Sequence, residues 1–301
     1  MSMNIPAHDS LTTRCLGNVF SKTVATYKYF WFLSIIQIHA KTNKLQMDVW
    51  DIVIRMVANA WYPIHYFRLS FGKSDSLFDI VIELQSITGI PIDADIENIC
   101  DVLGNRINDN RIKSKLRILT FNVPYRFLRP WIDTSDDREM VFRSQTFENE
   151  CLYSIHKEET EFYIEINPVW DTYLHNHYNI LSDFAYWNLA QFLQVRNPNV
   201  PAISNKLIKP ATRDSLSNQH RFWDTVIELG GTIHCIYTGR ELHRAEYALD
   251  HFIPWSFVSH NLLWNLIPAD NSINSSKGDK LPDLSIYRSL YNYNVIQYVF
   301  A

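Results

Sequence analysis

Glycine and cysteine are both scarce in this sequence, with 8 glycines and 4 cysteines among 301 residues. The four cysteines lie far apart and form no C-x-x-C pair; they are Cys15, Cys100, Cys151 and Cys235. This spacing excludes a dense disulfide framework and a four-cysteine zinc site. Because such usage fits a reducing compartment, we expect a cytoplasmic protein.

Long apolar runs are also missing. The most apolar stretch, residues 29–38, is too short to span a bilayer, and no charged-then-apolar signal segment precedes it. We expect a core helix there and no membrane partner. The 47% hydrophobic content is ample for a substantial core, so the composition predicts a soluble globular protein.

Positive charge is in deficit overall, since the formal net charge is −4. This argues against a protein whose whole surface wraps nucleic acid. Seven basic residues nevertheless fall between residues 105 and 129, against the single acid Asp109: Arg106, Arg111, Lys113, Lys115, Arg117, Arg126 and Arg129. A solvated surface is the usual meaning of such a run, and phosphate contacts are the second interpretation.

Amphipathic helices dominate the first two thirds of the chain. Apolar residues recur at intervals of three and four in residues 25–40 and 46–62, which predicts two helices, the second ending at Pro63. Ser74 is the expected N-cap of a third helix over residues 77–88. A mainly helical body is therefore predicted.

Three prolines and several asparagines between residues 196 and 210 predict a domain boundary. We place a mainly helical body over residues 1–204 and a small module over residues 205–301. Residues 151–166 add two strands joined by a polar turn to the body. Residues 123–131 mix prolines with aromatics, which favours a packed elbow over a nucleic-acid contact. The expected fold class is α+β.

The module changes from helical to strand periodicity. Residues 232–242 are β-prone around a turn at Thr238 and Gly239, and residues 246–250 form a second short strand ending at an acid. A helical run follows over residues 269–277. Strands and helix in this order predict a ββα arrangement, in which side chains from strand and helix face one pocket.

Four short motifs occupy this module in a fixed order. They are C-x-Y-x-G at residues 235–239, the pair Asp250-His251, Asn265, and Asn274-x-x-Lys277. In their order and spacing, residues 230–282 resemble the HNH nucleases of the ββα-metal group. The resemblance covers about a sixth of the chain and implies a C-terminal ββα-metal (HNH) nuclease module.

The resemblance assigns a role to each matching residue. Asp250 and Asn274 would be metal ligands, and His251 the general base that deprotonates the attacking water. Asn265 would hold the loop so that the imidazole faces the phosphate. Lys277 would contact the substrate phosphate.

The chemistry of phosphodiester hydrolysis supports the same roles. Histidine accepts a proton near neutral pH, and a cation opposes the charge that develops on the phosphorus oxygens. One carboxylate and one amide oxygen favour a single Mg²⁺ or Mn²⁺ per site.

A second metal, the structural zinc held by four cysteines in many relatives, is not expected. Cys235 remains, but Thr238, Asp270 and Ile273 occupy the other expected positions.

We therefore expect a metal-dependent endonuclease that cuts DNA, with RNA the less favoured substrate. Family habit suggests a role in phage defence. Two alternatives stay open: a nucleic-acid-binding or sensor protein with an inactive HNH module, and an RNase using the same residues. The helical body is expected to sense, to dock a partner or to contact DNA, and the expected partners besides nucleic acid are a second copy of the chain or a regulatory protein.

Overall fold

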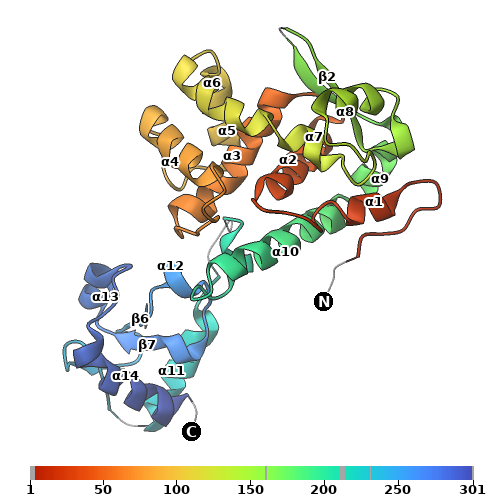
Figure 1. Cartoon of the computed structure of the whole chain (residues 1–301). Coiled ribbons are helices and arrows are strands. Elements are labelled where there is room, and N and C mark those ends of the chain that lie inside the picture. Colours follow the sequence, from red (N-terminus) through yellow and green to blue (C-terminus); the bar gives the residue numbers. More distant parts are fainter. Residues whose placement is uncertain (1–3, 160, 210–213, 231, 300–301) are drawn as a thin grey trace. The chain divides into compact units, whose positions relative to one another are not determined.

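Two compact units make up the chain (Figure 1). The structure, a computed structural model, describes residues 4–159, 161–209, 214–230 and 232–299. The N-terminal unit comprises Met1–Asn199 and Ile203–Ile208, and the C-terminal unit comprises Val200–Ala202 and Lys209–Ala301. The first is mainly helical and the second is a small module of strands and helices, which confirms the α+β fold class. Among the described residues, no helix combines the length and apolarity needed to cross a bilayer.

Helices form most of the N-terminal unit. Its α-helices are α1 (Thr13–Gly17), α2 (Tyr27–Thr42), α3 (Val49–His65), α4 (Leu77–Thr88), α5 (Ile96–Asn105), α6 (Asn110–Arg117), α7 (Val123–Phe127), α8 (Asp137–Ser144), α9 (Asp171–Asn176) and α10 (Tyr178–Arg196). Short 3₁₀ turns are η1 (Ile118–Thr120), η2 (Glu148–Glu150), η3 (Pro168–Trp170) and η4 (Ile203–Lys206). The strands are β1 (Gln46–Asp48), β2 (Tyr153–Lys157) and β3 (Phe162–Ile166).

Helix α3 is the centre of this unit. Asp48 caps it, because its Oδ1 accepts the Trp50 N–H at 2.7 Å. Every residue from 52 to 65 is buried, and α2, α4 and α5 all pack against the helix. The prediction that Pro63 ends this helix is wrong, since α3 continues to His65. The packing of α3 on all sides stabilises the helix by more than the loss of the one backbone hydrogen bond that Pro63 cannot donate.

A three-stranded antiparallel sheet covers another part of the unit, in the order β1-β3-β2. The two strands predicted within residues 151–166 are confirmed, with Ile155 opposite Ile164. Strand β1 was expected to be the start of a helix and instead pairs with β3. The predicted elbow is confirmed as packed, because Tyr125 and Phe127 of α7 are buried.

The start of α4 differs from the prediction, because its N-cap is Ser76, which forms no side-chain capping hydrogen bond to any described residue. Ser74 was expected to cap this helix, but Asp75 Oδ1 accepts the Leu77 N–H at 2.9 Å. The other carboxylate oxygen accepts the backbone N–H and the hydroxyl of Thr26, at 2.6 and 2.7 Å. Asp75 is favoured because one buried carboxylate joins two segments.

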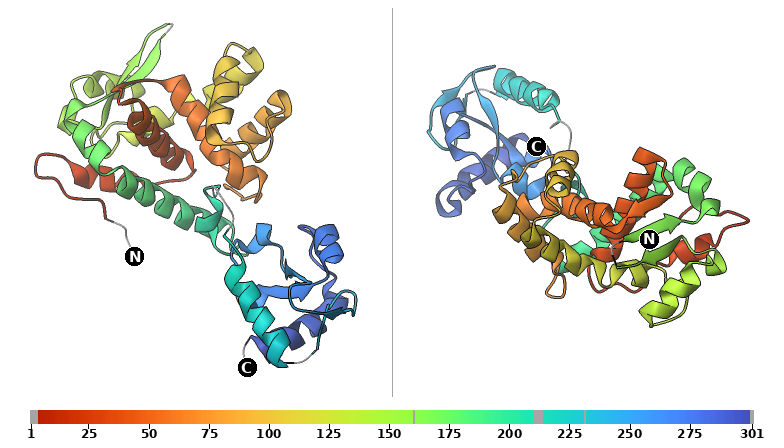
Figure 2. Two further views of the ribbon diagram at one scale, coloured as in Figure 1. Left: turned by 180° about the vertical axis from the view of Figure 1, so that it is seen from behind. Right: turned by 90° about the horizontal axis from the view of Figure 1, so that it is seen from above.

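The C-terminal unit contains α11 (Ser217–Gly230), β4 (Ile233–His234), β5 (Glu241–Leu242), β6 (Ala248–His251), α12 (Trp255–Val258), η5 (Leu263–Asn265), β7 (Leu266–Ala269), α13 (Asn271–Lys277) and α14 (Leu284–Tyr298). Figure 2 shows this unit from two further directions. The predicted hairpin is confirmed as β4 and β5, with Gly239 at φ +69° in its turn. Strand β7 was not expected, and it pairs antiparallel with β6.

The core of this unit lies between α11 and the strands. Trp223 of α11 is fully buried and donates its Nε1–H to the Leu266 carbonyl of β7 at 3.0 Å. The other buried members of this core are Ile233, Cys235, Leu242, Tyr247, Leu249, Leu266 and Ala269. All four residues of β7 are buried, which explains why its sequence lacks the alternation of a half-buried strand.

Candidate active site

Strand β6 brings Asp250 and His251 to the edge of a pocket of about 300 Å³. In the β6–β7 register, Asp250 lies opposite Ile267 and His251 lies opposite Leu266. Asn274 of α13 lines the same pocket. The remaining lining residues are Asp214, Leu216, Leu249, Pro254, Trp255, Asn261, Gly278 and Asp279.

The Asp250 carboxylate is buried and has two partners. Its Oδ1 accepts from Lys277 Nζ at 2.9 Å, and its Oδ2 accepts from the Tyr237 hydroxyl at 2.6 Å. The side chains of Asp250 and Lys277 are 3% and 7% exposed. Lys277 Nζ also donates to the His251 carbonyl at 2.7 Å. Burial, followed by the negative charge of Asp250, raises the pKa of Tyr237, so this phenol stays protonated and donates.

Helix α13 places Asn274 and Lys277 one turn apart on the same side of the helix. Asp270 caps this helix, with Oδ1 accepting the Ser272 N–H at 2.9 Å. Asn274 lies within this helix and is not its capping residue. No side-chain hydrogen bond of Asn274 to any described residue is formed, so its amide oxygen is available to the pocket.

His251 is half-buried and held by a neighbouring loop. Its Nε2 lies 3.0 Å from Asn261 Oδ1. Burial lowers the pKa of His251, although the Asn261 contact and the Asp250 charge oppose that shift. A lowered pKa favours the neutral imidazole, which is the form that accepts a proton.

Asn265 closes the loop between β6 and β7. Its Oδ1 accepts the Ile253 N–H and its Nδ2 donates to the Ile253 carbonyl, both at 2.8 Å. The side chain is fully buried. This pair of bonds fixes the backbone two residues after His251 and so restricts where the imidazole points.

Cys235 is buried in the core of the C-terminal unit, and its Sγ accepts the Asp270 N–H at 3.4 Å. Asp270 also pairs with Arg240 at 3.0 Å. At position 270, where the sequence lacks the second cysteine of a zinc site, the acid serves as helix cap and ion-pair partner. Within the described ranges, no three His, Cys, Asp or Glu side chains gather as a metal cluster.

The donors at the pocket fit a hard divalent cation. The Asp250 carboxylate already forms an ion pair with the Lys277 ammonium, so this position accommodates positive charge. Asn274 adds an amide oxygen from the facing helix. One carboxylate and one amide leave most positions around Mg²⁺ or Mn²⁺ for water and substrate oxygens.

Sequence reasoning missed two residues of the site. Tyr237 is part of the C-x-Y-x-G motif, but nothing in the motif indicated that its hydroxyl reaches Asp250. Asn261 carried no signal, since it lies in a loop at no recognisable spacing. Its carbonyl accepts from Gln219 of α11 at 2.9 Å, which fixes it beside His251.

Part of the C-terminal unit is similar to known nucleases. Residues 235–283 match the family model of the HNH endonucleases. A CRISPR-associated endonuclease Cas9 of Listeria innocua is 38% identical over 56 residues, which are 18% of this chain and 4% of that protein. The match therefore covers a small part of each of the two proteins. No solved structure matches the chain.

HNH nucleases generally depend on a divalent metal, and the oxygen donors of this pocket suit such a cation. The matched residues include β5 to β7 and α13, with every residue of the candidate site that the sequence indicated. The C-terminal unit thus carries an HNH endonuclease domain over residues 235–283.

Proposed function

We propose that this protein is a metal-dependent endonuclease that hydrolyses phosphodiester bonds in DNA. The observation that carries the proposal is the meeting of Asp250, His251 and Asn274 in one pocket of about 300 Å³. A base and two hard oxygen ligands reach the same space from strand and helix. This is the set of groups that hydrolysis of a phosphodiester needs.

His251 is the proposed general base. Its neutral imidazole accepts the proton of the attacking water, and Asn261 and Asn265 orient the ring and the loop that follows it. Asp250 and Asn274 would hold one Mg²⁺ or Mn²⁺, which supplies Lewis-acid stabilisation of the phosphate charge. The base and the ligands are different side chains, so each role can be removed separately.

Lys277 has two proposed roles. It neutralises the buried carboxylate of Asp250 in the structure described above. Once Asp250 engages a metal, Lys277 would be released toward the substrate phosphate, which was its role in the resemblance. The flexible lysine stem allows both positions.

We further propose that the enzyme is cytoplasmic and acts in defence against invading DNA, on the habit of the family and on the CRISPR-associated relative. An inactive module is the weaker alternative, because the base and both proposed ligands are present and converge. An RNase would use the same residues, so the substrate has to be tested directly.

The test compares DNA and RNA substrates of matched sequence with the purified full chain, in Mg²⁺, in Mn²⁺ and in EDTA. We expect cleavage of DNA in either metal and none in EDTA. Preferred cleavage of RNA would assign the same site to an RNase. Cleavage that persists in EDTA would overturn the metal-dependent mechanism.

A further inference from the structure

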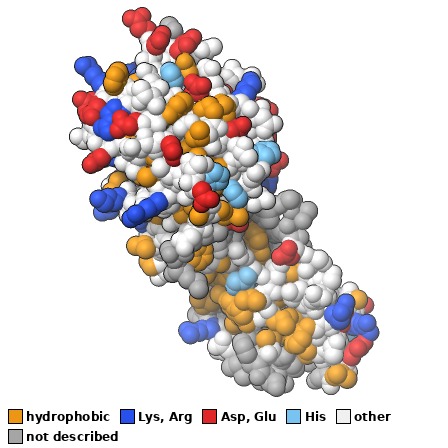
Figure 3. Space-filling view, turned by 90° about the vertical axis from the view of Figure 1, so that its right-hand side faces the viewer, with side chains coloured by type: hydrophobic (Ala, Val, Ile, Leu, Met, Phe, Trp, Pro, Cys, Tyr) orange, Lys and Arg blue, Asp and Glu red, His pale blue; other side chains and the backbone are white. Residues whose placement is uncertain are grey.

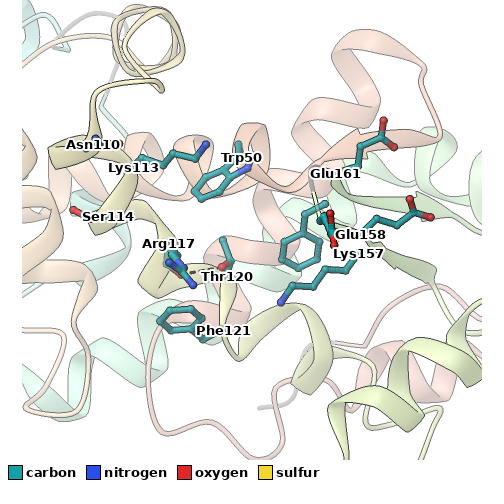
Figure 4. Close-up of a pocket in the computed structure, with 12 residues that line it drawn as sticks. Trp50, Asn110, Lys113, Ser114, Arg117, Thr120, Phe121, Lys157, Glu158 and Glu161 are labelled. Atoms are coloured by element: carbon teal, nitrogen blue, oxygen red, sulfur yellow. Dashed lines mark hydrogen bonds between the residues drawn. The ribbon is translucent and has the colours of Figure 1, made fainter.

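A second pocket, of about 550 Å³, lies within the N-terminal unit (Figure 4). Its walls come from the first turn of α3, from α6 with the turn after it, and from the hairpin of β2 and β3. Lining residues used below are Trp50, Lys113, Arg117, Phe121, Lys157 and Phe162. Nothing in the proposed hydrolysis uses them.

The basic run that sequence analysis singled out divides at this pocket. Arg106 and Arg111 pair with Asp109 at 3.4 and 3.1 Å, and Lys115 pairs with Glu83. Lys113 and Arg117 of α6 form no ion pair with any described residue, and both side chains line the pocket. Two cations of the run that lack an ion pair with the described residues therefore face the cavity.

Each cation of the pocket lies over an aromatic ring. Lys113 Nζ is 5.2 Å from the centre of the Trp50 ring, and the Arg117 guanidinium is 5.7 Å from that of Phe121. Lys157 Nζ is 5.0 Å from the Phe162 ring. Phe121 is 48% exposed. The Phe121 side chain is therefore partly open to solvent beside a positive charge.

Acidic side chains occupy one wall. Glu158, Glu159 and Glu161 belong to the turn between β2 and β3. In Figure 4 the carboxylates of Glu158 and Glu161 lie on the side away from Arg117 and Phe121. On the face of this unit that Figure 3 shows, acidic and basic side chains are interspersed. The pocket is polarised, with a cationic aromatic side and an acidic side.

We propose that this pocket binds an unpaired nucleobase together with its adjoining phosphate. The base stacks on Phe121, and Arg117 and Lys113 contact the phosphate, because stacking beside guanidinium and ammonium groups is how proteins hold single-stranded nucleic acid. The acidic wall accepts hydrogen bonds from amino or hydroxyl groups and keeps the phosphate on the cationic side.

A base within a duplex is stacked on its neighbours and cannot enter such a pocket without being flipped out. The ligand is therefore a single strand or a free nucleotide, which share this chemistry. The inference deepens the proposed function, because it gives a nuclease a second nucleic-acid contact. It is tested by binding in EDTA, so it stands or falls separately from cleavage.

The experiment measures fluorescence anisotropy of a labelled single-stranded DNA of about twelve nucleotides with the full chain in EDTA. Phe121→Ala should weaken binding about tenfold, since it removes the stacking surface. Arg117→Gln should weaken binding about fivefold and lower the slope of log affinity against log salt by about 1.

Matched controls come from the same unit. Phe142 is 73% exposed on α8 and is not among the residues that line the pocket, so Phe142→Ala tests for loss of any surface phenylalanine. Arg126 belongs to the same basic run and is exposed outside the pocket, so Arg126→Gln tests for loss of charge alone. Circular dichroism checks that all four variants fold.

The outcomes separate the two ligand sources. Displacement of the labelled strand by excess deoxyadenosine monophosphate supports the pocket with a free nucleotide as ligand, and displacement only by unlabelled strand supports it with a single strand. If Phe121→Ala binds like Phe142→Ala, or Arg117→Gln like Arg126→Gln, the proposal is overturned. Absence of single-strand binding by folded wild type together with no binding of the mononucleotide overturns it as well.

Discussion

Lys277 Nζ lies 2.9 Å from Asp250 Oδ1, with both side chains almost completely buried. The carboxylate that is proposed to bind a metal is thus already paired with one positively charged side chain. A cation entering the site would compete with the lysine for this oxygen. Removal of Lys277 and addition of metal should therefore have linked effects on stability.

We predict that Lys277→Met destabilises the metal-free protein and strengthens its response to metal. Breaking a buried ion pair costs about 3 kcal/mol, because it leaves Asp250 charged without its partner. Mn²⁺ should restore stability, since it supplies the missing charge without a competitor. Thermal unfolding with and without Mn²⁺ measures this, with Lys280→Met, a change at an exposed lysine, as the control. An equal Mn²⁺ response in both variants would rule out the competition.

Metal binding should depend on Asp250 and Asn274 individually. Titration calorimetry with Mn²⁺ should show affinity falling in Asp250→Ala and Asn274→Ala by at least the roughly 10- to 100-fold that outer-shell residues cost. Asp279→Ala is the matched control, because this exposed carboxylate lines the same pocket without a proposed ligand role. Wild-type affinity in either ligand variant would remove that residue from the metal site.

Asn261 is predicted to position His251. Removing its contact at 3.0 Å with Nε2 should lower kcat about three- to tenfold, in proportion to one hydrogen bond, and leave KM unchanged. The thermal midpoint of Asn261→Ala should match that of Asn271→Ala, an exposed asparagine of α13. A fall in stability without a change in kcat would make Asn261 a purely structural residue.

Asn265→Ala should be strongly destabilising. The change leaves the N–H and the carbonyl of Ile253 without their partners in a buried loop. We expect a loss of about 2 to 4 kcal/mol in the free energy of unfolding. Chemical denaturation of the full chain measures it, again with Asn271→Ala as reference. A loss below about 1 kcal/mol would contradict the role of this side chain as the clamp of the loop.

Most of the fold was predictable where periodicity decides structure. The helices near residues 25–40 and 77–88 and the two strands within 151–166 followed from their apolar spacing. Strand β7 was not predicted because all its residues are buried, so its sequence shows no alternation of apolar and polar residues. The predicted helix end at Pro63 was wrong because packing on all sides of α3 outweighs the local tendency of proline to end a helix.

The candidate site was predictable as a set of residue types but not as a set of contacts. Asp250, His251 and Asn274 were chosen for their spacing, and they line one pocket. The contact of Asp250 with Lys277 depends on how α13 packs against β6, and its contact with Tyr237 depends on where the turn between β4 and β5 lies. Such distances between elements are not encoded in any local pattern.

The central claim is that His251 activates water for cleavage of DNA. Its most direct test is the initial rate at which purified protein relaxes supercoiled plasmid in Mg²⁺ or Mn²⁺, measured for wild type, His251→Ala and the exposed control His243→Ala. We predict that His251→Ala lowers the rate at least about 100-fold while His243→Ala leaves it unchanged. Relaxation by a folded His251→Ala variant at the wild-type rate would contradict the account.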